Sequence, residues 1–279
     1  MCAGMFMGAS IDISVKALAD SYSTAQIVFL RSMFALPLIL LICHFDSGLR
    51  SLATPRWGWQ ITRGLLTAGA NFGFFYGIAH VPLVTAVLLA YISPVLIVLL
   101  ARPVLGERVG VHRWFGILIA FGGVLLVVRP ANLDLHPAVW AIFGSAACWA
   151  LLSLSNRKLA GIEPTSVLTF YTIPVSAVLG FVLSLDSWRV PQHVDWMLFA
   201  VAGFSGCMAH LLVAMAYRNG PAAAIAPFEY TTLVWTAIAG YWFWRETPDP
   251  MIWVGGAAVI LGGYLSLQSP RQLLRVSSR

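Results

Sequence analysis

Two ionisable side chains stand inside apolar stretches, where a charge is costly. Glu229 lies in an apolar run over residues 222–244, and His210 lies in another over 195–217. Each run is long enough to cross a bilayer, which takes roughly 20 apolar residues. A carboxylate at that depth costs several kcal/mol unless it is paired or faces water, so it marks a functional site by default. Glu229 therefore has the chemistry to bind a cationic group or to carry a proton.

The spacing of these two residues indicates that they lie at the same depth. If the two runs form a hairpin that turns between Asn219 and Gly220, each residue lies about nine to ten positions from the turn, at 1.5 Å per residue. We predict a facing Glu229–His210 pair that lines a cavity and could exchange a proton or hold a cationic group. The alternative is a structural hydrogen bond between two helices.

Asp12 and Arg31 show the same geometry about a turn near Ser21 and Tyr22. Level opposite charges inside a bilayer predict an ion pair, for which a structural role is favoured over ligand binding because a paired charge satisfies itself. Asp12 nevertheless remains a candidate for contact with a ligand. Lys16 follows Asp12 by one helical turn and could compete for it.

Aromatic residues that share the same runs could stack on a planar or cationic ligand, although most aromatics in such a chain serve packing or anchor the interface. Pro94 and Pro227 lie within apolar runs, where each allows a kink, and they are candidate gating positions. The predicted substrate-binding set is Glu229, His210, Asn71, Tyr91, Tyr230, Trp235, Asp12 and Trp149.

The composition places the chain among integral membrane proteins. Of its 279 residues, 59% are hydrophobic and 10% are charged, whereas soluble domains carry about 25% charged residues. The net charge of +6 is scattered between apolar runs, which argues against nucleic acid binding. We predict an all-α protein with ten transmembrane helices, at about 2–20, 24–44, 57–79, 83–102, 113–130, 137–156, 166–185, 195–217, 222–244 and 251–268.

Loop charges predict the orientation. One set of connecting loops holds most of the Lys and Arg residues, and such loops face the cytoplasm. With ten spans, both termini and the tail over 269–279 are then cytoplasmic. The first apolar run begins within a few residues of Met1, so we expect no removable signal. The four cysteines are not spaced as a metal pair or a disulfide framework, and we expect no metal and no cofactor.

The chain repeats itself at an offset of about 139 residues. The two halves, 1–130 and 137–268, each hold five expected spans and must be inverted relative to one another, as in many secondary transporters. Glu229 falls on Ala90, and His210 falls on Asn71, so the fold itself does not need an acid or an imidazole at those depths. The matched pairs include Gly64 with Gly203, Pro82 with Pro221, Tyr91 with Tyr230, Glu107 with Glu246, and Trp114 with Trp253.

These features resemble the EamA family of the drug/metabolite transporter superfamily. The resemblance covers nearly the whole chain and implies ten helices, a central cavity and alternating access. Its local strings are similar to members that carry S-adenosylmethionine, riboflavin or amino-acid-like compounds. Arg245 stands where the family usually has Gly, so that turn is expected to differ. The resemblance rests on Gly106-Glu107, Arg245-Glu246, Gly122-Gly123, Gly262-Gly263, Phe29-Leu30-Arg31-Ser32 and Ala226-Pro227-Phe228-Glu229-Tyr230.

We therefore predict a secondary transporter, not an enzyme, in the bacterial inner membrane. Its partners are the lipid bilayer and a small metabolite, which is amino-acid-like, S-adenosylmethionine-like or otherwise cationic or amphiphilic. In one version of this prediction, transport is coupled to protons. The protein is a monomer or a homodimer. One alternative is a riboflavin, other vitamin or drug transporter of the same fold. Another is an intramembrane serine protease using Ser205. However, Ser205 and His210 lie five residues apart on one predicted helix, about 140° apart in azimuth, which argues against a nucleophile–base contact.

Overall fold

The computed structural model describes residues 1–106, 110–128 and 136–245, with scattered positions between 251 and 265. Within this part the regular elements are all helical, which confirms the all-α prediction. The tail over 269–279 and the repeat residues Glu107 and Glu246 lie outside the described residues. The long helices are α1 (Cys2–Ala19), α2 (Thr24–Asp46), α3 (Trp57–His80), α6 (Val111–Val128), α7 (Pro137–Lys158) and α10 (Asp195–Asn219).

Length and composition suit these helices to a membrane. Six described segments are long and apolar enough to cross one: Cys2–Ala19, Thr24–Asp46, Leu83–Leu105, Pro137–Lys158, Thr165–Ser187 and Asp195–Asn219. A shorter apolar helix covers Trp114–Gly123. Large apolar side chains such as Leu41, Leu118 and Val182 face outward, as a lipid environment allows. The total of ten spans remains a prediction.

Three of the expected spans are interrupted helices. The fourth is α4 (Leu83–Ala90) followed by α5 (Ile92–Leu105); the seventh is α8 (Thr165–Phe170) followed by α9 (Thr172–Ser184); and the ninth is α11 (Ala222–Ile225), the 3₁₀ helix η4 (Ala226–Thr231) and α12 (Thr232–Trp244). The first two breaks fall at Tyr91 and Tyr171, each three residues before a proline. A proline has no amide hydrogen, and its ring clashes with the carbonyl four residues earlier, so the helix is interrupted there. Short 3₁₀ helices, η1 (Leu49–Leu52) and η3 (Leu185–Ser187), follow α2 and α9.

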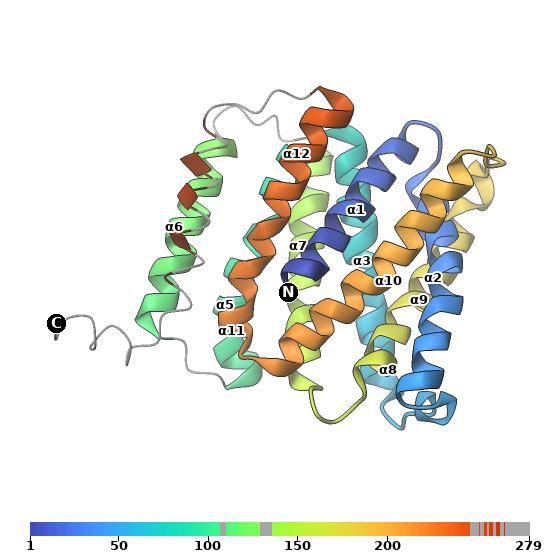
Figure 1. Cartoon of the computed structure of the whole chain (residues 1–279), viewed down its shortest axis with the longest axis horizontal. Helices are drawn as coiled ribbons and strands as arrows, with labels where there is room; N and C mark the ends of the chain where they lie inside the picture. The colour runs from blue at the N-terminus through green and yellow to red at the C-terminus, as the bar shows by residue number, and fades with distance from the viewer. Residues whose placement is uncertain are drawn as a thin grey trace.

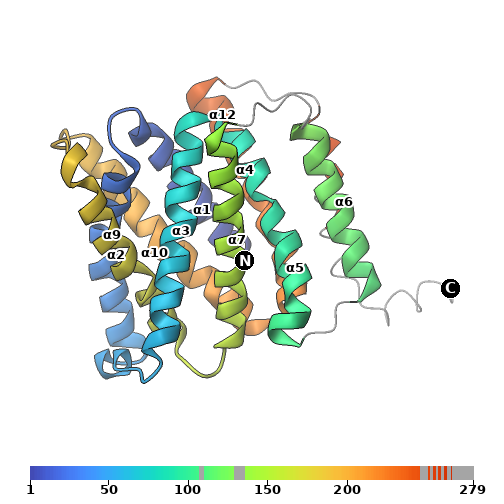
Figure 2. The ribbon, with the colours of Figure 1, turned by 180° about the vertical axis from the view of Figure 1, so that it is seen from behind.

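The helices form a flattened bundle. In Figure 1, α1, α10 and α12 lie toward the viewer, with α2 and α9 at one edge and α6 at the other. Figure 2 shows the reverse face, where α3, α7, α4 and α5 come forward. The closest packed helix pairs include α3 with α7, α1 with α10, and α2 with α9.

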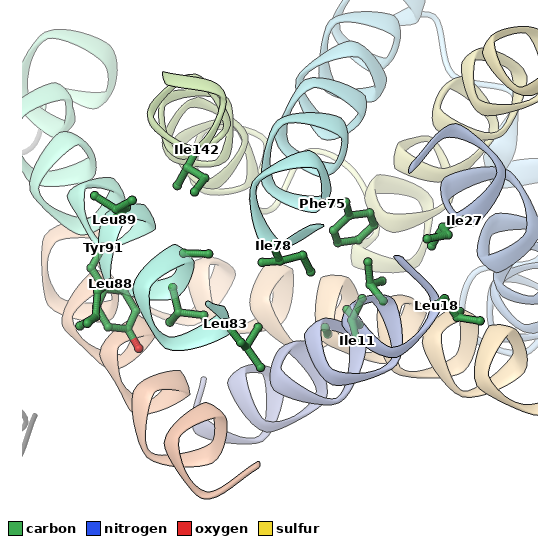
Figure 3. Packing of buried hydrophobic residues seen from close by; sticks show 14 of the residues in the cluster. Ile11, Leu18, Ile27, Phe75, Ile78, Leu83, Leu88, Leu89, Tyr91 and Ile142 are labelled. Atoms are coloured by element: carbon green, nitrogen blue, oxygen red, sulfur yellow. The ribbon is translucent and has the colours of Figure 1, made fainter. Parts of the chain in front are cut away.

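Buried apolar side chains from both faces meet inside the bundle. Figure 3 shows part of this core, with Ile11 and Leu18 from α1, Phe75 and Ile78 from α3, and Ile142 from α7. All of these side chains are at most 8% exposed, so the core fixes how α1, α3 and α7 surround the space between them.

Two repeat-matched glycines allow close approach between helices. A Cβ on Gly64 in α3 would lie 2.4 Å from Val175 Cγ2 in α9, and a Cβ on Gly203 in α10 would lie 2.5 Å from the Arg31 carbonyl oxygen in α2. Neither position has room for a methyl group. Gly203 is thus explained by helix packing.

The cap residue Arg245 has the same backbone conformation as its counterpart in the first half. Gly106 ends α5 with φ of 69°, and Arg245 ends α12 with φ of 55°. Both are left-handed C-terminal caps, the conformation that glycine adopts without penalty. At the cap residue the expected difference is therefore absent, because the arginine takes the glycine conformation and bears its strain; the rest of the turn lies outside the described residues.

Candidate functional site

A cavity of about 160 Å³ lies among α1, α3, α4, α5, α7, α10, η4 and α12. Its wall is mainly apolar, with a few polar groups facing inward, a composition usual for small-molecule sites. Six of the eight residues predicted to bind substrate line it: Asp12, Asn71, Tyr91, Trp149, His210 and Glu229. They come from helices that are far apart in the chain.

Glu229 is held by neutral donors. Its Oε1 accepts a hydrogen bond from the Tyr217 hydroxyl at 2.8 Å, and its Oε2 accepts one from Ser93 Oγ at 3.0 Å. The Trp149 side chain also hydrogen-bonds to it. Glu229 is only 4% exposed, and no described Lys, Arg or His side chain forms an ion pair with it. The site thus holds a carboxylate with three hydrogen bonds and no described counter-charge.

His210 lies in the same cavity but not on Glu229. Its ring packs against Trp149, with ring centroids 5.7 Å apart and planes tilted by 55°. No hydrogen bond between His210 and Glu229 occurs among the described contacts. His210 and Glu229 therefore line the same cavity without touching each other, and Trp149 contacts both.

Asp12 and Arg31 are close enough to interact electrostatically, yet no salt bridge joins them. The Arg31 guanidinium instead lies 5.1 Å above the Phe75 ring centroid, and its Nε has no hydrogen-bond partner. The predicted ion pair is therefore not a direct contact in this structure. Lys16, the possible competitor for Asp12, lies over the ring of Trp244 at 5.2 Å.

Arg31 and His210 also share a second, smaller polar pocket of about 10 Å³. This pocket is lined by hydroxyls from three helices, and Gly206 forms part of its wall. A Cβ on Gly206 would lie 2.8 Å from Arg31 Nη1. Glycine at this position therefore leaves room for the guanidinium.

The two repeat-matched tyrosines touch each other. The rings of Tyr91 and Tyr230 meet edge to face with centroids 5.0 Å apart, and the Tyr91 hydroxyl donates to the Tyr230 carbonyl oxygen at 3.1 Å. The break between α4 and α5 thus lies directly against η4. Pro94 is buried in the first turn of α5, and Pro227 belongs to η4.

Two members of the predicted set do not line the cavity. Tyr230 is buried behind it at 1% exposure, and its hydroxyl has no partner. Trp235 is 38% exposed and packs on Phe6, with ring centroids 5.1 Å apart. Asn71 lines the cavity, and its Nδ2 has no hydrogen-bond partner, so it offers a donor to a ligand.

The sequence analysis missed Ser93 and Tyr217. Ser93 is matched with Thr232 at the repeat offset, and both line the cavity. Tyr217 follows His210 by seven residues, two helical turns, so it occupies the same face of α10. Either signal would have placed them near Glu229. Ser205 is buried in α10 and is not among the residues that line the cavity.

The family model and the similar proteins of known name are all transporters. The model of the EamA-like transporter family matches residues 1–129 and 136–268. An S-adenosylmethionine uptake transporter of Rickettsia prowazekii (strain Madrid E) is 28% identical over 250 residues, which cover 90% of this chain and 84% of that protein. The pseudopaline exporter CntI of Pseudomonas aeruginosa is 29% identical, with 88% and 87% covered. A riboflavin transporter of Vibrio cholerae is 26% identical, with 82% and 78% covered.

One solved structure, described as "Crystal structure of protein", superposes with a TM-score of 0.77. The match covers 97% of this chain and 98% of the other at 19% identity. At that identity, the likeness concerns the fold alone.

Proposed function

The chain belongs to the EamA-like transporter family, within the drug/metabolite transporter superfamily, and from this membership we propose that it is a secondary transporter. It moves a small cationic or amphiphilic metabolite across a bacterial inner membrane by alternating access. Membership supports a small-molecule membrane transporter, as do the names of its relatives. The substrate class rests on the cavity.

The observation that carries this proposal is the environment of Glu229. A carboxylate buried in the bundle without a counter-ion is costly in its charged form. A cationic group on the substrate, or a proton, would relieve that cost, while the bonds from Tyr217 and Ser93 hold the carboxylate in place. Glu229 therefore either contacts the cation directly or carries a coupling proton.

The packing supports an inverted relation between the halves. At the offset of 139 residues α3 corresponds to α10, α7 to α1, and α9 to α2. The packed pairs α3–α7 and α3–α9 then correspond to α10–α1 and α10–α2, and all four pairs pack closely. Two residues that correspond under a two-fold rotation can touch only beside its axis, as Tyr91 and Tyr230 do. We accordingly propose ten spans with both termini in the cytoplasm.

The relatives suggest which cations to test first. One is named for S-adenosylmethionine, which bears an ammonium and a sulfonium group, and another for pseudopaline. A cavity with two carboxylates, Asp12 and Glu229, favours an amino-acid-like cation. The alternative, riboflavin, is planar and would use the rings of Trp149 and Tyr91.

Reconstitution in liposomes tests the proposal. The purified chain is assayed with radiolabelled S-adenosylmethionine, riboflavin and a panel of amino acids, at two pH gradients. Protein-dependent flux of an amino-acid-like cation supports it, and flux that follows the pH gradient indicates proton coupling. Flux of riboflavin alone would favour the alternative, and flux of none would contradict the proposed substrate class.

A further inference from the structure

Polar contacts close the bundle at both ends of α2. The loop over residues 20–23 precedes α2, and the segment over 47–56 follows it. The 23 residues of α2 separate these connections by about 35 Å at 1.5 Å per residue. Figure 1 shows them at opposite ends of the molecule. Each contacts a loop that comes from beyond residue 136.

The first set of contacts, which we name the Tyr22 latch, consists of Tyr22, Gln26, Arg189 and Asp195. The Tyr22 hydroxyl donates to Asp195 Oδ2 at 2.5 Å. Gln26 Oε1 accepts from the Arg189 backbone N–H at 3.0 Å, and its Nε2 donates to the Arg189 carbonyl. Gln26 is fully buried and Tyr22 is 7% exposed.

The phenol is kept as a donor in this latch. Burial and the hydrogen bond to Asp195 raise the pKa of Tyr22. Tyr22 therefore keeps its proton, and with it the ability to donate, throughout the physiological range.

The second set, the Glu163 latch, consists of Thr54, Arg56 and Glu163. Glu163 Oε1 accepts from Thr54 Oγ1 at 2.6 Å and pairs with Arg56 Nη1 at 3.2 Å. Glu163 is 8% exposed and Thr54 is 4% exposed. A nearby bond from Ser166 Oγ to Asp46 Oδ2 at 2.7 Å supports the same closure.

The two latches occupy matched positions. The repeat offset of 139 carries Arg56 onto Asp195, at the start of α3 and of α10 respectively. It carries Tyr22 onto Gly161, two residues before Glu163 in the loop that follows α7. Each latch thus joins the start of α3 or α10 to the loop that follows α7 or α1. The partners are chemically different, so the contacts are not a relic of identical side chains.

Their position and chemistry suit reversible opening. Both latches lie at the ends of the helices, where separated polar groups exchange their partners for water. A hydrogen bond that is exchanged for bonds to water changes the free energy only modestly, and more when one of the groups is charged. Between the two ends, the bundle also holds a large cluster of buried apolar side chains. The latches hold the first residues of α3 and α10, and both of these helices also line the cavity.

We propose that the Tyr22 latch and the Glu163 latch fasten the two opposite gates of the cavity and that one opens while the other holds. The proposal rests on the proposed transport function. It assigns gating to residues that do not line the cavity.

Thiol labelling tests the gates without a substrate. Cys2, Cys43, Cys148 and Cys207 are replaced, and Ala90→Cys places a reporter in the cavity wall. A membrane-impermeant thiol reagent is added to right-side-out or to inside-out vesicles. Loss of a hydrogen bond to a charged group biases an opening equilibrium by about tenfold or more.

Each latch variant should speed labelling from one face of the membrane only. Glu163→Ala speeds labelling by about tenfold from the face that carries Glu163 and leaves the other face unchanged. Tyr22→Phe does the same from the opposite face. Arg56→Gln repeats the first result if Glu163→Ala folds poorly. Asp186→Asn and Arg50→Gln, exposed charges in the two latch-bearing connections, serve as controls and leave labelling unchanged.

Two results would overturn the proposal. One is labelling that neither latch variant alters, and the other is labelling that rises equally from both faces. Because the readout needs no substrate, absence of flux of the panel compounds in liposomes would contradict the proposed substrate class without affecting the labelling result. Labelling changes on a single face, found together with absent flux, would retain the gates and refute the proposed substrate class.

Discussion

Ser93 Oγ donates to Glu229 Oε2 at 3.0 Å, so a residue just after the break in the fourth span holds the acid in the interrupted ninth span. The two residues are 136 positions apart in the chain. Next to this bond, the Tyr91 hydroxyl donates to the Tyr230 carbonyl. The interrupted helices therefore cross-link at the cavity, and a ligand that takes the carboxylate competes with Ser93 for it.

Glu229→Gln should reduce transport of the compound that the liposome panel identifies. The amide keeps the shape but removes the charge that attracts a cation or holds a proton. Loss of a charge-assisted contact worth roughly 1.5–3 kcal/mol predicts at least about a tenfold fall in uptake. Initial rates in liposomes measure it, with equal protein insertion verified. Asp186→Asn is the control, and wild-type rates for Glu229→Gln would exclude the role.

Tyr217→Phe keeps the ring and removes one donor to Glu229. Loss of a hydrogen bond to a buried carboxylate lowers the free energy of unfolding by roughly 1.5–3 kcal/mol. Each kcal/mol lowers the midpoint of thermal unfolding by about 2–4 °C in a chain of roughly this size. Thermal unfolding in detergent measures the shift. In a double-mutant cycle, the shift should be much smaller in a Glu229→Gln background; simple additivity would show that the two residues are not coupled.

Gly203→Ala should separate α10 from α2. The new methyl would lie 2.5 Å from the Arg31 carbonyl oxygen, and overpacking of this kind typically costs about 1–3 kcal/mol. Gly144→Ala in α7 is the matched control, because a Cβ there meets nothing within 4 Å. The control should be neutral or stabilising by up to about 1 kcal/mol, since alanine favours helix over glycine. Equal midpoints for the two variants would contradict the packing account.

Arg245→Gly should stabilise the protein. The arginine has φ of 55°, a conformation that costs a non-glycine residue about 1–2 kcal/mol. Glycine removes this strain but gives up part of the gain through its greater freedom in the unfolded chain. A rise in thermal midpoint checks the prediction. The opposite change, Gly106→Ala, should lower it, and a fall for Arg245→Gly would indicate that the arginine side chain makes a compensating contact.

Single cysteines in a cysteine-free background test the orientation. Asp20→Cys and Asp186→Cys should react with an impermeant reagent from the periplasmic face, and Arg50→Cys and Ile162→Cys from the cytoplasmic face. All four positions are exposed. The reverse pattern would invert the topology, and a mixed pattern would contradict the inverted halves.

Depth was the property that sequence could predict. Helical rise and turn position put Glu229 and His210 level with one another, and both lie in the cavity. Composition likewise sufficed for the all-helical membrane fold. Neither requires knowledge of how a helix is rotated about its axis.

Azimuth was less predictable, because it depends on the breaks. The 3₁₀ turns of η4 advance 120° per residue instead of 100°, so the face of α12 cannot be extrapolated from Glu229. Trp235, six residues after Glu229, would lie about 120° away from it even on a regular α-helix, and it does not line the cavity. Asp12 and Arg31 interact without direct contact in this structure, and the Phe75 ring, from a third helix, lies under the guanidinium. A pairwise depth argument cannot detect a third partner.

Gly206 gives one substitution an unusual meaning. A methyl group there would meet the movable tip of Arg31 instead of rigid backbone, at 2.8 Å from Nη1. The helices could therefore keep their spacing while the positive charge is displaced beside His210. Gly206→Ala adds only one methyl group and changes no ionisable residue. At this position it would nevertheless change the electrostatics of the pocket, because it displaces the charge of Arg31.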